Sequence, residues 1–180
     1  MDKEQQKQKK WDRSFMESAK IFAEHSNCAA KKVACLLVKN NAVISIGVNG
    51  TLPSLENCNE KFIKMTGIWY RKENRTKVSS IGGEDRFRET MVECEDQEEH
   101  FKWSKENEVH AEINALGKAS KAGISTEGAT AYITYSPCNT CALALAACGI
   151  KRIVFEHLYD AESEAMLPVK EYGVEIVALE

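Results

Sequence analysis

The chain has 180 residues, 43% hydrophobic and 28% charged, a composition that can bury the core of one domain of ordinary size. Its net charge of −3 argues against a protein that coats DNA or RNA, because such proteins usually carry a basic excess. No stretch approaches the roughly 18 uninterrupted apolar residues of a membrane helix, and the start of the chain lacks the apolar core of a secretory signal. We therefore expect a cytoplasmic protein that binds neither membranes nor nucleic-acid polymers.

The first ten residues are almost wholly polar, and we expect them to be frayed, with a single domain over 11–180. Apolar residues from Trp11 to His25 recur at helical spacing, which predicts an amphipathic first helix. Two apolar runs, 33–38 and 42–48, are separated by a pair of asparagines, a pattern typical of a β-hairpin.

The regular pattern is lost from Asn49 to about residue 108, where the chain is polar and charged. A segment of this length without regular structure is uncommon in a compact domain. We therefore expect an ordered insertion at about 50–108, built of short helices, with a mobile part near 72–86.

Helical and strand patterns alternate over the rest of the chain. The expected helices are His110–Ala122, Pro137–Cys148 and Ala161–Glu171, and the expected strands are Ala129–Tyr135, Arg152–Phe155 and Val174–Ala178. Proline at the start and glycine after the end support the second helix. The order β-β-α-β-α-β-α-β predicts an α/β fold, a central mixed sheet of about five strands flanked by helices.

Two short motifs carry the residues of a metal site, His110-Ala111-Glu112 and Pro137-Cys138-Asn139-Thr140-Cys141. One imidazole and two thiolates make three protein ligands, and catalytic zinc sites usually have three, with the fourth position left for water. Seven cysteines, an odd number, favour metal ligands over a disulfide framework. The start of a helix also favours thiolate over thiol. The motifs therefore predict a catalytic Zn²⁺ held by His110, Cys138 and Cys141.

Glu112 is the candidate catalytic residue, because it lies two residues after a ligand and can reach a water on the metal. Zinc lowers the pKa of bound water from about 16 toward about 7. A glutamate in this position can accept the proton of that water and pass it to a substrate. The alternatives are a structural zinc knuckle, which usually has a fourth protein ligand, and a redox Cys-x-x-Cys pair, in which His110 and Glu112 have no role.

At these motifs the chain resembles the cytidine and deoxycytidylate deaminase superfamily. The likeness to the deoxycytidylate branch covers most of the chain. It extends to Trp11-Asp12-x-x-Phe15-Met16-x-x-Ala19, Lys32-Val33, Gly47-Val48-Asn49-Gly50, Asn57-Cys58-x-Glu60 and the segment from Glu127 to Cys138. The resemblance implies a three-layer cytidine-deaminase-like fold and zinc-dependent hydrolysis of dCMP to dUMP and ammonia, which supplies the precursor for thymidylate synthesis.

The resemblance also implies contacts with the nucleotide. Asn49 is similar to the asparagine that holds the deoxyribose hydroxyl, and Ala111 to the residue whose backbone contacts the pyrimidine edge. Ser136 stands where the end of a strand lines the base pocket.

Three further positions are candidate substrate contacts, Lys32, Trp103 and Tyr159. Lys32 suits the phosphate, although a solvated lysine beside Lys31 fits the sequence as well. Tyr159 is similar to an aromatic residue near the base or phosphate, although a packing role fits a lone tyrosine after a strand equally.

Departures from the family pattern lie beside the sugar and phosphate positions. Ala34-Cys35 replaces the usual Gly-Ala, Val48 replaces a tyrosine, and the proline after the Asn-Gly turn is displaced to Pro53. The alternative functions are deamination of another free nucleoside, nucleotide or base, and a non-catalytic zinc-binding interaction protein. The last of these predicts loss of the glutamate, whereas Glu112 is present.

A second, structural Zn²⁺ is implied by the same resemblance. Cys28, Cys58 and His100 lie in the contexts where some deoxycytidylate deaminases carry its ligands. Structural zinc normally has four protein ligands, and the candidates for the fourth are Cys94, Glu99 and Asp96. The alternative is a pair of ordinary thiols and a surface histidine.

Regulation and assembly rest on the resemblance alone. Deoxycytidylate deaminases with a long insertion are commonly activated by dCTP and inhibited by dTTP, and the likeness suggests a homo-oligomer, a hexamer. The basic residues that suit a triphosphate are Arg71, Lys72, Arg75, Lys77, Arg86 and Arg88. A solvated charged loop is the alternative for this segment.

Overall fold

The computed structural model describes residues 2–81, 84–159 and 166–179, and leaves out the side chains of 74–81 and 84–89. The chain divides into two compact units, each of which is described by itself. Unit 1 comprises Met1–Ser26, Lys32–Asn49 and Val109–Glu180, and unit 2 comprises Asn27–Lys31 and Gly50–Glu108. Among the described residues, no helix has both the length and the apolar character that crossing a bilayer demands.

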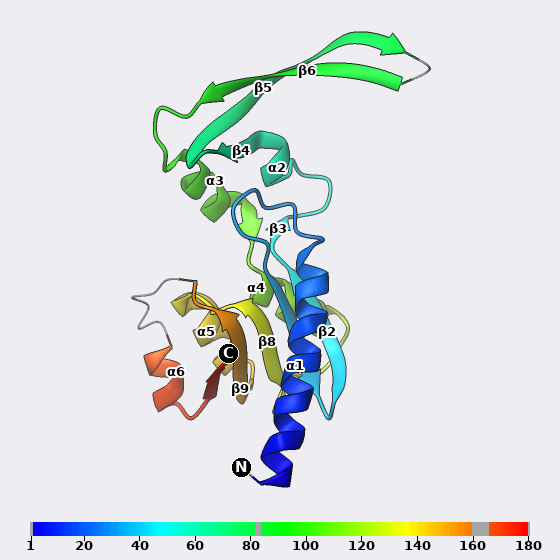
Figure 1. Ribbon diagram of the computed structural model, residues 1–180. Helices are drawn as coiled ribbons and strands as arrows, with labels where there is room; N and C mark the ends of the chain where they lie inside the picture. The colour runs from blue at the N-terminus through cyan, green and yellow to red at the C-terminus, as the bar shows by residue number, and fades with distance from the viewer. Residues whose placement is uncertain (1, 82–83, 160–165, 180) are drawn as a thin grey trace. The chain divides into compact units, whose positions relative to one another are not determined.

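Unit 1 is built on a five-stranded sheet in the order β10-β9-β8-β1-β2 (Figure 1). β1 pairs antiparallel with β2 and β8, whereas β8, β9 and β10 run parallel, so the sheet is mixed. The strands are β1 (Ala34–Lys39), β2 (Ala42–Val48), β8 (Thr130–Tyr135), β9 (Arg152–His157) and β10 (Glu175–Ala178). This sheet confirms the fold class predicted from the sequence.

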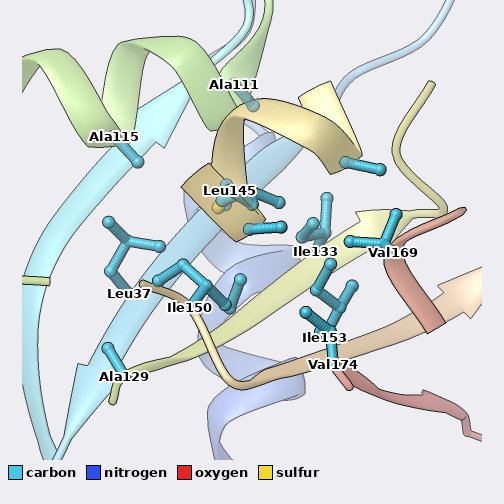
Figure 2. Close-up of a cluster of buried hydrophobic side chains, with 14 of the residues drawn as sticks. Leu37, Ala111, Ala115, Ala129, Ile133, Leu145, Ile150, Ile153, Val169 and Val174 are labelled. Carbon is cyan, nitrogen blue, oxygen red and sulfur yellow. The ribbon is translucent and has the colours of Figure 1, made fainter. Parts of the chain in front are cut away.

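Helices cover both faces of the sheet, which gives three layers. α1 (Lys3–Ala23) packs in a cluster with Leu36 and Tyr132. The opposite cluster includes Leu37 and Ile133 and holds residues from α4 (Ala111–Lys121), α5 (Asn139–Ala147) and α6 (Leu167–Glu171) (Figure 2). Successive strand residues point to opposite layers, and since both layers are apolar the strands are continuous apolar runs in the sequence.

α1 begins at Lys3 instead of Trp11, so it includes residues that we expected to be frayed. The Asp2 side chain accepts the backbone N–H of Gln5 at 2.8 Å, and the Gln5 side chain accepts that of Asp2 at 3.1 Å. This capping box satisfies two donors at the helix start, and the Gln, Lys and Glu residues that follow are good helix formers. They are exposed, so no apolar periodicity marked them. At the other end of the chain, 161–165 of the third expected helix lies outside the described residues.

Unit 2 contains a three-stranded antiparallel sheet in the order β4-β5-β6 and two short helices. Its elements are α2 (Cys58–Lys61), β4 (Phe62–Met65), β5 (Ile68–Ile81), β6 (Glu84–Glu93) and α3 (Glu99–Asn107). The two ends of the insertion, β3 (Gly50–Thr51) and β7 (Glu108–Val109), form a two-stranded sheet.

The long hairpin of β5 and β6 corrects the expectation that the insertion consists of short helices. β5 begins with Ile68-Trp69-Tyr70, residues that favour strands, and Gly82-Gly83 separates the two strands in the sequence, which is a typical hairpin spacing. The signal was hidden because polar and charged residues fill most of both strands and no alternation of apolar and polar residues marks them.

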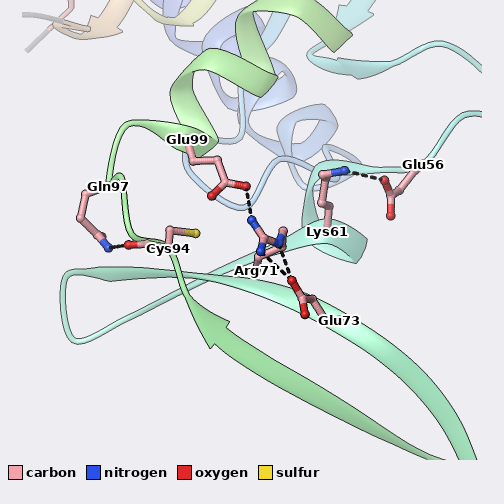
Figure 3. A network of polar contacts seen from close by, with 7 residues as sticks. All are labelled: Glu56, Lys61, Arg71, Glu73, Cys94, Gln97 and Glu99. Atoms are coloured by element: carbon pink, nitrogen blue, oxygen red, sulfur yellow. Dashed lines mark hydrogen bonds and ion pairs between the residues drawn. The ribbon is translucent and has the colours of Figure 1, made fainter.

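A small aromatic core stabilises unit 2. Phe62, Trp69 and Cys94 are buried together, and Trp103 packs against them. Close by, the Arg71 guanidinium makes ion pairs with Glu73 at 2.6 Å and Glu99 at 2.7 Å (Figure 3). β5 is thereby tied to α3 on the polar side of this core.

Candidate active site and a second metal-binding group

Two helix N-termini bring His110, Cys138 and Cys141 together in unit 1. His110 is the N-cap of α4, Cys138 is the N-cap of α5, and Cys141 lies in the first turn of α5. The Nδ1 atom of His110 is 3.4 Å from the Sγ of Cys141 and 3.7 Å from the Sγ of Cys138. One nitrogen and two sulfurs at these distances form a group that can hold a metal ion.

The surroundings of this group suit metal binding. Hydrogen bonds from Cys141 and His110 lower the pKa of the Cys138 thiol to about 4, and a metal ligand must be a thiolate. Cys141 is buried whereas His110 is exposed, so the group is accessible from one side.

Glu112 lies beside the metal-binding group. It is the second residue of α4, its side chain is buried, and its carboxyl group is hydrogen-bonded with Cys141. Burial raises the pKa of this carboxyl group. A buried glutamate with a raised pKa, next to a group that can hold a metal, suits proton transfer.

The contact of α4 with β2 fixes the position of His110 and Glu112. The Ser45 hydroxyl donates to the carbonyl of Ala115 at 2.7 Å, and the Asn114 amide donates to the carbonyl of Val48 at 2.8 Å. Gly47 allows this approach, because a Cβ atom there would lie 2.0 Å from the carbonyl oxygen of Ala111. The start of α4 therefore rests directly on the backbone of β2.

Four of the candidate substrate contacts lie at the ends of elements of unit 1. Asn49 follows β2, Ala111 opens α4, and Ser136 follows β8. The Ser136 hydroxyl is buried and accepts the backbone N–H of Tyr159 at 2.8 Å, while the Tyr159 side chain is exposed. Ser136 therefore holds the chain that presents Tyr159.

The other two candidates, Lys32 and Trp103, lie in different units. Lys32 belongs to unit 1, where its Nζ is 3.3 Å from the Glu24 carboxylate, so this lysine has an anionic partner within the chain. Trp103 belongs to unit 2, where its ring packs 5.6 Å from that of Phe62.

Unit 2 contains a second group of metal-ligand type, Cys28, Cys58 and His100. All three are buried, and their ligand atoms lie within 4.8 Å of one another. The Cys58 Sγ is 3.1 Å from the Nε2 of His100. The Trp69 ring stacks on the His100 ring at 3.8 Å with an interplanar angle of 4°, which fixes the orientation of the imidazole.

Glu108 was not identified from the sequence. The Cys28 thiol donates to its Oε2 at 3.5 Å, the Ser104 hydroxyl also donates to Oε2, and Oε1 is buried without a hydrogen-bond partner among the described residues. Burial raises the pKa of this carboxyl group. A half-buried carboxylate beside Cys28, with one buried oxygen that has no hydrogen-bond partner among the described residues, has the chemistry of a further ligand.

The structure places the three expected fourth ligands outside the second group. Cys94 packs in the aromatic core, Glu99 pairs with Arg71, and Asp96 pairs with Lys102 at 2.6 Å. Glu108, like these three, is not within 4.8 Å of all members of the group, but it contacts Cys28 directly. Which acid lies nearest to Cys28 is determined by the fold and not by distance along the chain.

Comparison with known proteins agrees with this geometry. Residues 9–157 match the family model described as the cytidine and deoxycytidylate deaminase zinc-binding region. The chain belongs to this deaminase family. Membership decides against a redox Cys-x-x-Cys pair, because the matched region is a zinc-binding one that spans both motifs.

Similar proteins include other members of the deaminase family. The deoxycytidylate deaminase of Enterobacteria phage T2 is 36% identical over 154 residues, covering 82% of this chain and 80% of that protein. That of phage T4 is 34% identical, covering 82% and 78%. The dCMP deaminase of cyanophage S-TIM5, solved in complex with dCMP and dUMP, matches 99% of each chain with a TM-score of 0.64 at 23% identity, which supports the fold.

Proposed function

We propose that this chain is a zinc-dependent dCMP deaminase that converts dCMP to dUMP and ammonia, supplying the precursor for thymidylate synthesis. The observation that carries the proposal is the group of His110, Cys138 and Cys141 at two helix N-termini with the buried carboxyl group of Glu112 beside it. The relatives named deoxycytidylate deaminase support dCMP as substrate.

In the proposed mechanism His110, Cys138 and Cys141 would hold the zinc, with one imidazole and two thiolates as ligands. Bound zinc supplies a water that ionises near neutral pH. Glu112 would accept one proton of the attacking water and donate it to N3 of the cytosine ring. It would then take the proton of the hydroxyl newly bonded to C4 and deliver it to the amine, so that ammonia leaves as the C4 carbonyl forms. Its buried position keeps it out of bulk water and close to the group that it serves.

Substrate contacts in the proposal come from residues at the ends of elements. The amide of Asn49 meets the sugar hydroxyl, the backbone of Ala111 and the wall at Ser136 meet the base, and Tyr159 stacks near it. Trp103, in unit 2, stays a candidate substrate contact without an assigned role, and Lys32 remains a candidate for the phosphate end. Lys32 must exchange its Glu24 partner for the nucleotide to take this role.

Ammonia release from metal-loaded protein tests the function. We expect kcat/KM to be highest for dCMP and lower for CMP, deoxycytidine and cytosine, because the last two lack the phosphate and CMP carries an additional hydroxyl. Equal efficiency on deoxycytidine and dCMP would refute a phosphate-specific site. No ammonia from any of the four, with zinc bound, would favour a non-catalytic zinc-binding protein.

A second, structural zinc at Cys28, Cys58 and His100 belongs to the same proposal. Three buried soft ligands at short mutual distance support it, and Glu108 replaces the earlier candidates as the fourth ligand. Structural zinc normally has four protein ligands. Oε1 of Glu108 is buried without a hydrogen-bond partner among the described residues, and a bound cation would satisfy it. Zinc here would join the segment 27–31 to the insertion.

We also propose regulation by dCTP and dTTP and assembly into a hexamer in the cytoplasm. Of the basic residues expected to meet a triphosphate, Arg71 and Lys72 have described side chains, and Arg71 pairs with two glutamates. The side chains of Arg75, Lys77, Arg86 and Arg88 lie outside the described residues. Exposed aliphatic side chains on adjacent helices, Ile113 and Leu143, suit a contact between subunits. All seven cysteines are free thiols, as a reducing compartment favours.

A change in dCMP kinetics on addition of dCTP, reversed by dTTP, tests the regulation, and sedimentation tests the assembly. Hyperbolic dCMP kinetics unchanged by either triphosphate would contradict it. A monomer at assay concentration would contradict the hexamer.

A further inference from the structure

The amide of Asn49 is held by two donors on its oxygen. The backbone N–H of Val33 donates to Oδ1 at 2.8 Å, and the Ser26 hydroxyl donates to the same atom at 2.7 Å. A backbone N–H can only donate, so the side-chain atom that faces it must be the oxygen. The Nδ2 end of Asn49 therefore points away from Val33 and presents hydrogen-bond donors.

Ser26 is itself held firmly. It follows α1, its backbone N–H donates to the carbonyl of Ala23 at 2.9 Å, and its side chain is 4% exposed. Its hydroxyl also lies 3.1 Å from the backbone oxygen of Asn49. A small, buried side chain with a fixed backbone has little freedom to move, so its hydroxyl is a stable reference point for the amide.

Val33 and Ser26 have different effects on the amide. The Val33 N–H sets which end of Asn49 is oxygen, and a single bond of this kind leaves the amide free to pivot about it. The second donor, from Ser26, removes the pivot. The two together fix both the identity and the direction of the donor that Asn49 presents, which is how a binding group is preorganised.

We infer that Ser26 is a positioning residue for nucleotide recognition: it holds the Asn49 amide so that Nδ2 donates to a hydroxyl oxygen of the deoxyribose. The inference rests on the proposed function, in which Asn49 meets the sugar. Ser26 touches no substrate atom and acts through Asn49 alone. Its loss should therefore be felt only by substrates that carry the hydroxyl.

The test compares dCMP with 2′,3′-dideoxycytidine monophosphate, which lacks the 3′-hydroxyl. Ser26→Ala should lower kcat/KM for dCMP about tenfold, the effect of one well-placed hydrogen bond, and leave the dideoxy nucleotide unchanged. Most of the loss should appear in KM. Ser26→Thr keeps a hydroxyl and should restore much of the preference for dCMP.

Ser18→Ala is the control, because it deletes another hydroxyl of unit 1 that donates to a backbone carbonyl, at 2.9 Å, and lies on α1 outside the candidate site. It should keep the wild-type ratio of the two efficiencies, whatever it does to stability. An equal loss on both substrates in Ser26→Ala would reduce Ser26 to a structural residue and overturn the inference.

Asn49→Ala separates this inference from the proposal on which it rests. If Asn49→Ala abolishes the preference for dCMP and Ser26→Ala does not, the inference is wrong and the sugar contact stands. If Asn49→Ala leaves the preference intact, the sugar contact and the inference fail together. A wild-type protein without activity on dCMP overturns the substrate proposal and the inference with it.

Discussion

The Asp12 carboxylate and the Arg152 guanidinium form a bidentate ion pair, with hydrogen bonds of 2.7 and 2.9 Å, between α1 and the first residue of β9. The Tyr132 hydroxyl on β8 donates to the same carboxylate at 2.8 Å. Asp12 is 2% exposed, so this contact is sheltered from water. One carboxylate thus joins α1 to two neighbouring strands.

Acid should unfold unit 1 partly through Asp12. Burial alone would raise the pKa of this carboxyl group, but hydrogen bonds from Arg152, Gln8 and Tyr132 outweigh it and hold the pKa below its ordinary value of 3.8. A lowered pKa stabilises the folded state above the unfolded pKa, and this contribution is lost as pH falls through the folded pKa. Thermal unfolding between pH 7 and pH 2 should show a loss of stability below about pH 4 that is smaller in Asp12→Asn.

At neutral pH, Asp12→Ala should lower the free energy of unfolding by about 3–5 kcal/mol, because it leaves Arg152 without its buried partner. Asp96→Ala removes an exposed ion pair with Lys102 and should have a far smaller effect. Similar losses in the two variants would show that burial does not determine the strength of the Asp12 pair.

Glu112→Gln should lower kcat by about a hundredfold or more while the protein keeps its zinc and its fold, because general acid–base catalysis contributes effects of that size. Glu4 occupies the same second position of a helix, in α1, with no metal ligand nearby, so Glu4→Gln is the matched control. Steady-state kinetics and metal analysis are the measurements. Substantial turnover by zinc-loaded Glu112→Gln would contradict the mechanism.

Gly47→Ala should damage activity through the position of α4. The added Cβ would lie 2.0 Å from the Ala111 carbonyl oxygen and 2.4 Å from the Ala115 nitrogen, so the helix must shift. We expect a loss of about 1–3 kcal/mol in stability, with a fall in kcat that exceeds what the loss of folded protein explains.

Gly117→Ala is the control for that variant. Gly117 lies in α4, the helix that Gly47 contacts, and a Cβ there meets no atom within 4 Å. It should stabilise the protein by about 0.5–1 kcal/mol, because alanine is the better helix former. Unchanged activity in Gly47→Ala would mean that the start of α4 has more freedom than its contact with β2 indicates.

Metal analysis of protein purified without chelator should give two zinc ions per chain. His100→Ala and Cys58→Ala should each reduce the content to one and destabilise the protein, with the zinc at His110 retained. Because Trp69 stacks on His100, removal of the second zinc should also change tryptophan fluorescence. Cys148→Ala, at an exposed thiol, should keep both metals.

Glu108→Gln distinguishes the fourth ligand of that site. It should weaken zinc binding at the second group, whereas Cys94→Ala should not, since Cys94 packs in the aromatic core. The opposite result would return Cys94 to the ligand set. One zinc per chain in the wild type would show that Cys28, Cys58 and His100 are not a metal site.

Apart from the exposed start of α1, the elements of unit 1 could be predicted from the sequence because each carries its own pattern. The strands that pair as Leu36 with Tyr132 and Ile153 with Ala131 are buried on both faces and therefore appear as apolar runs. The sequences of β5 and β6 contain no comparable apolar run. Their pairing, such as Lys72 with Met91, is a relation between distant residues that neither segment reveals alone.

The candidate site divides in the same way. His110, Cys138 and Cys141 belong to compact motifs whose spacing reflects the first turn of a helix, so the sequence identifies them. Glu108 stands 80 residues from Cys28 and meets it only in the folded chain. Nothing distinguishes it in the sequence from the other acids of its segment.

The pairing of β1 with β8 also determines how the chain must fold. β1 and β2 are neighbours in sequence, so their hairpin is a local contact. The pairing of Leu36 with Tyr132 is a long-range contact, because the whole insertion separates the two residues in the sequence. Closing a loop costs entropy that grows with its length, and a compact unit 2 makes the effective loop shorter. Conditions that unfold unit 2 alone should therefore lower the refolding rate of the sheet of unit 1 and have a smaller effect on its free energy of unfolding.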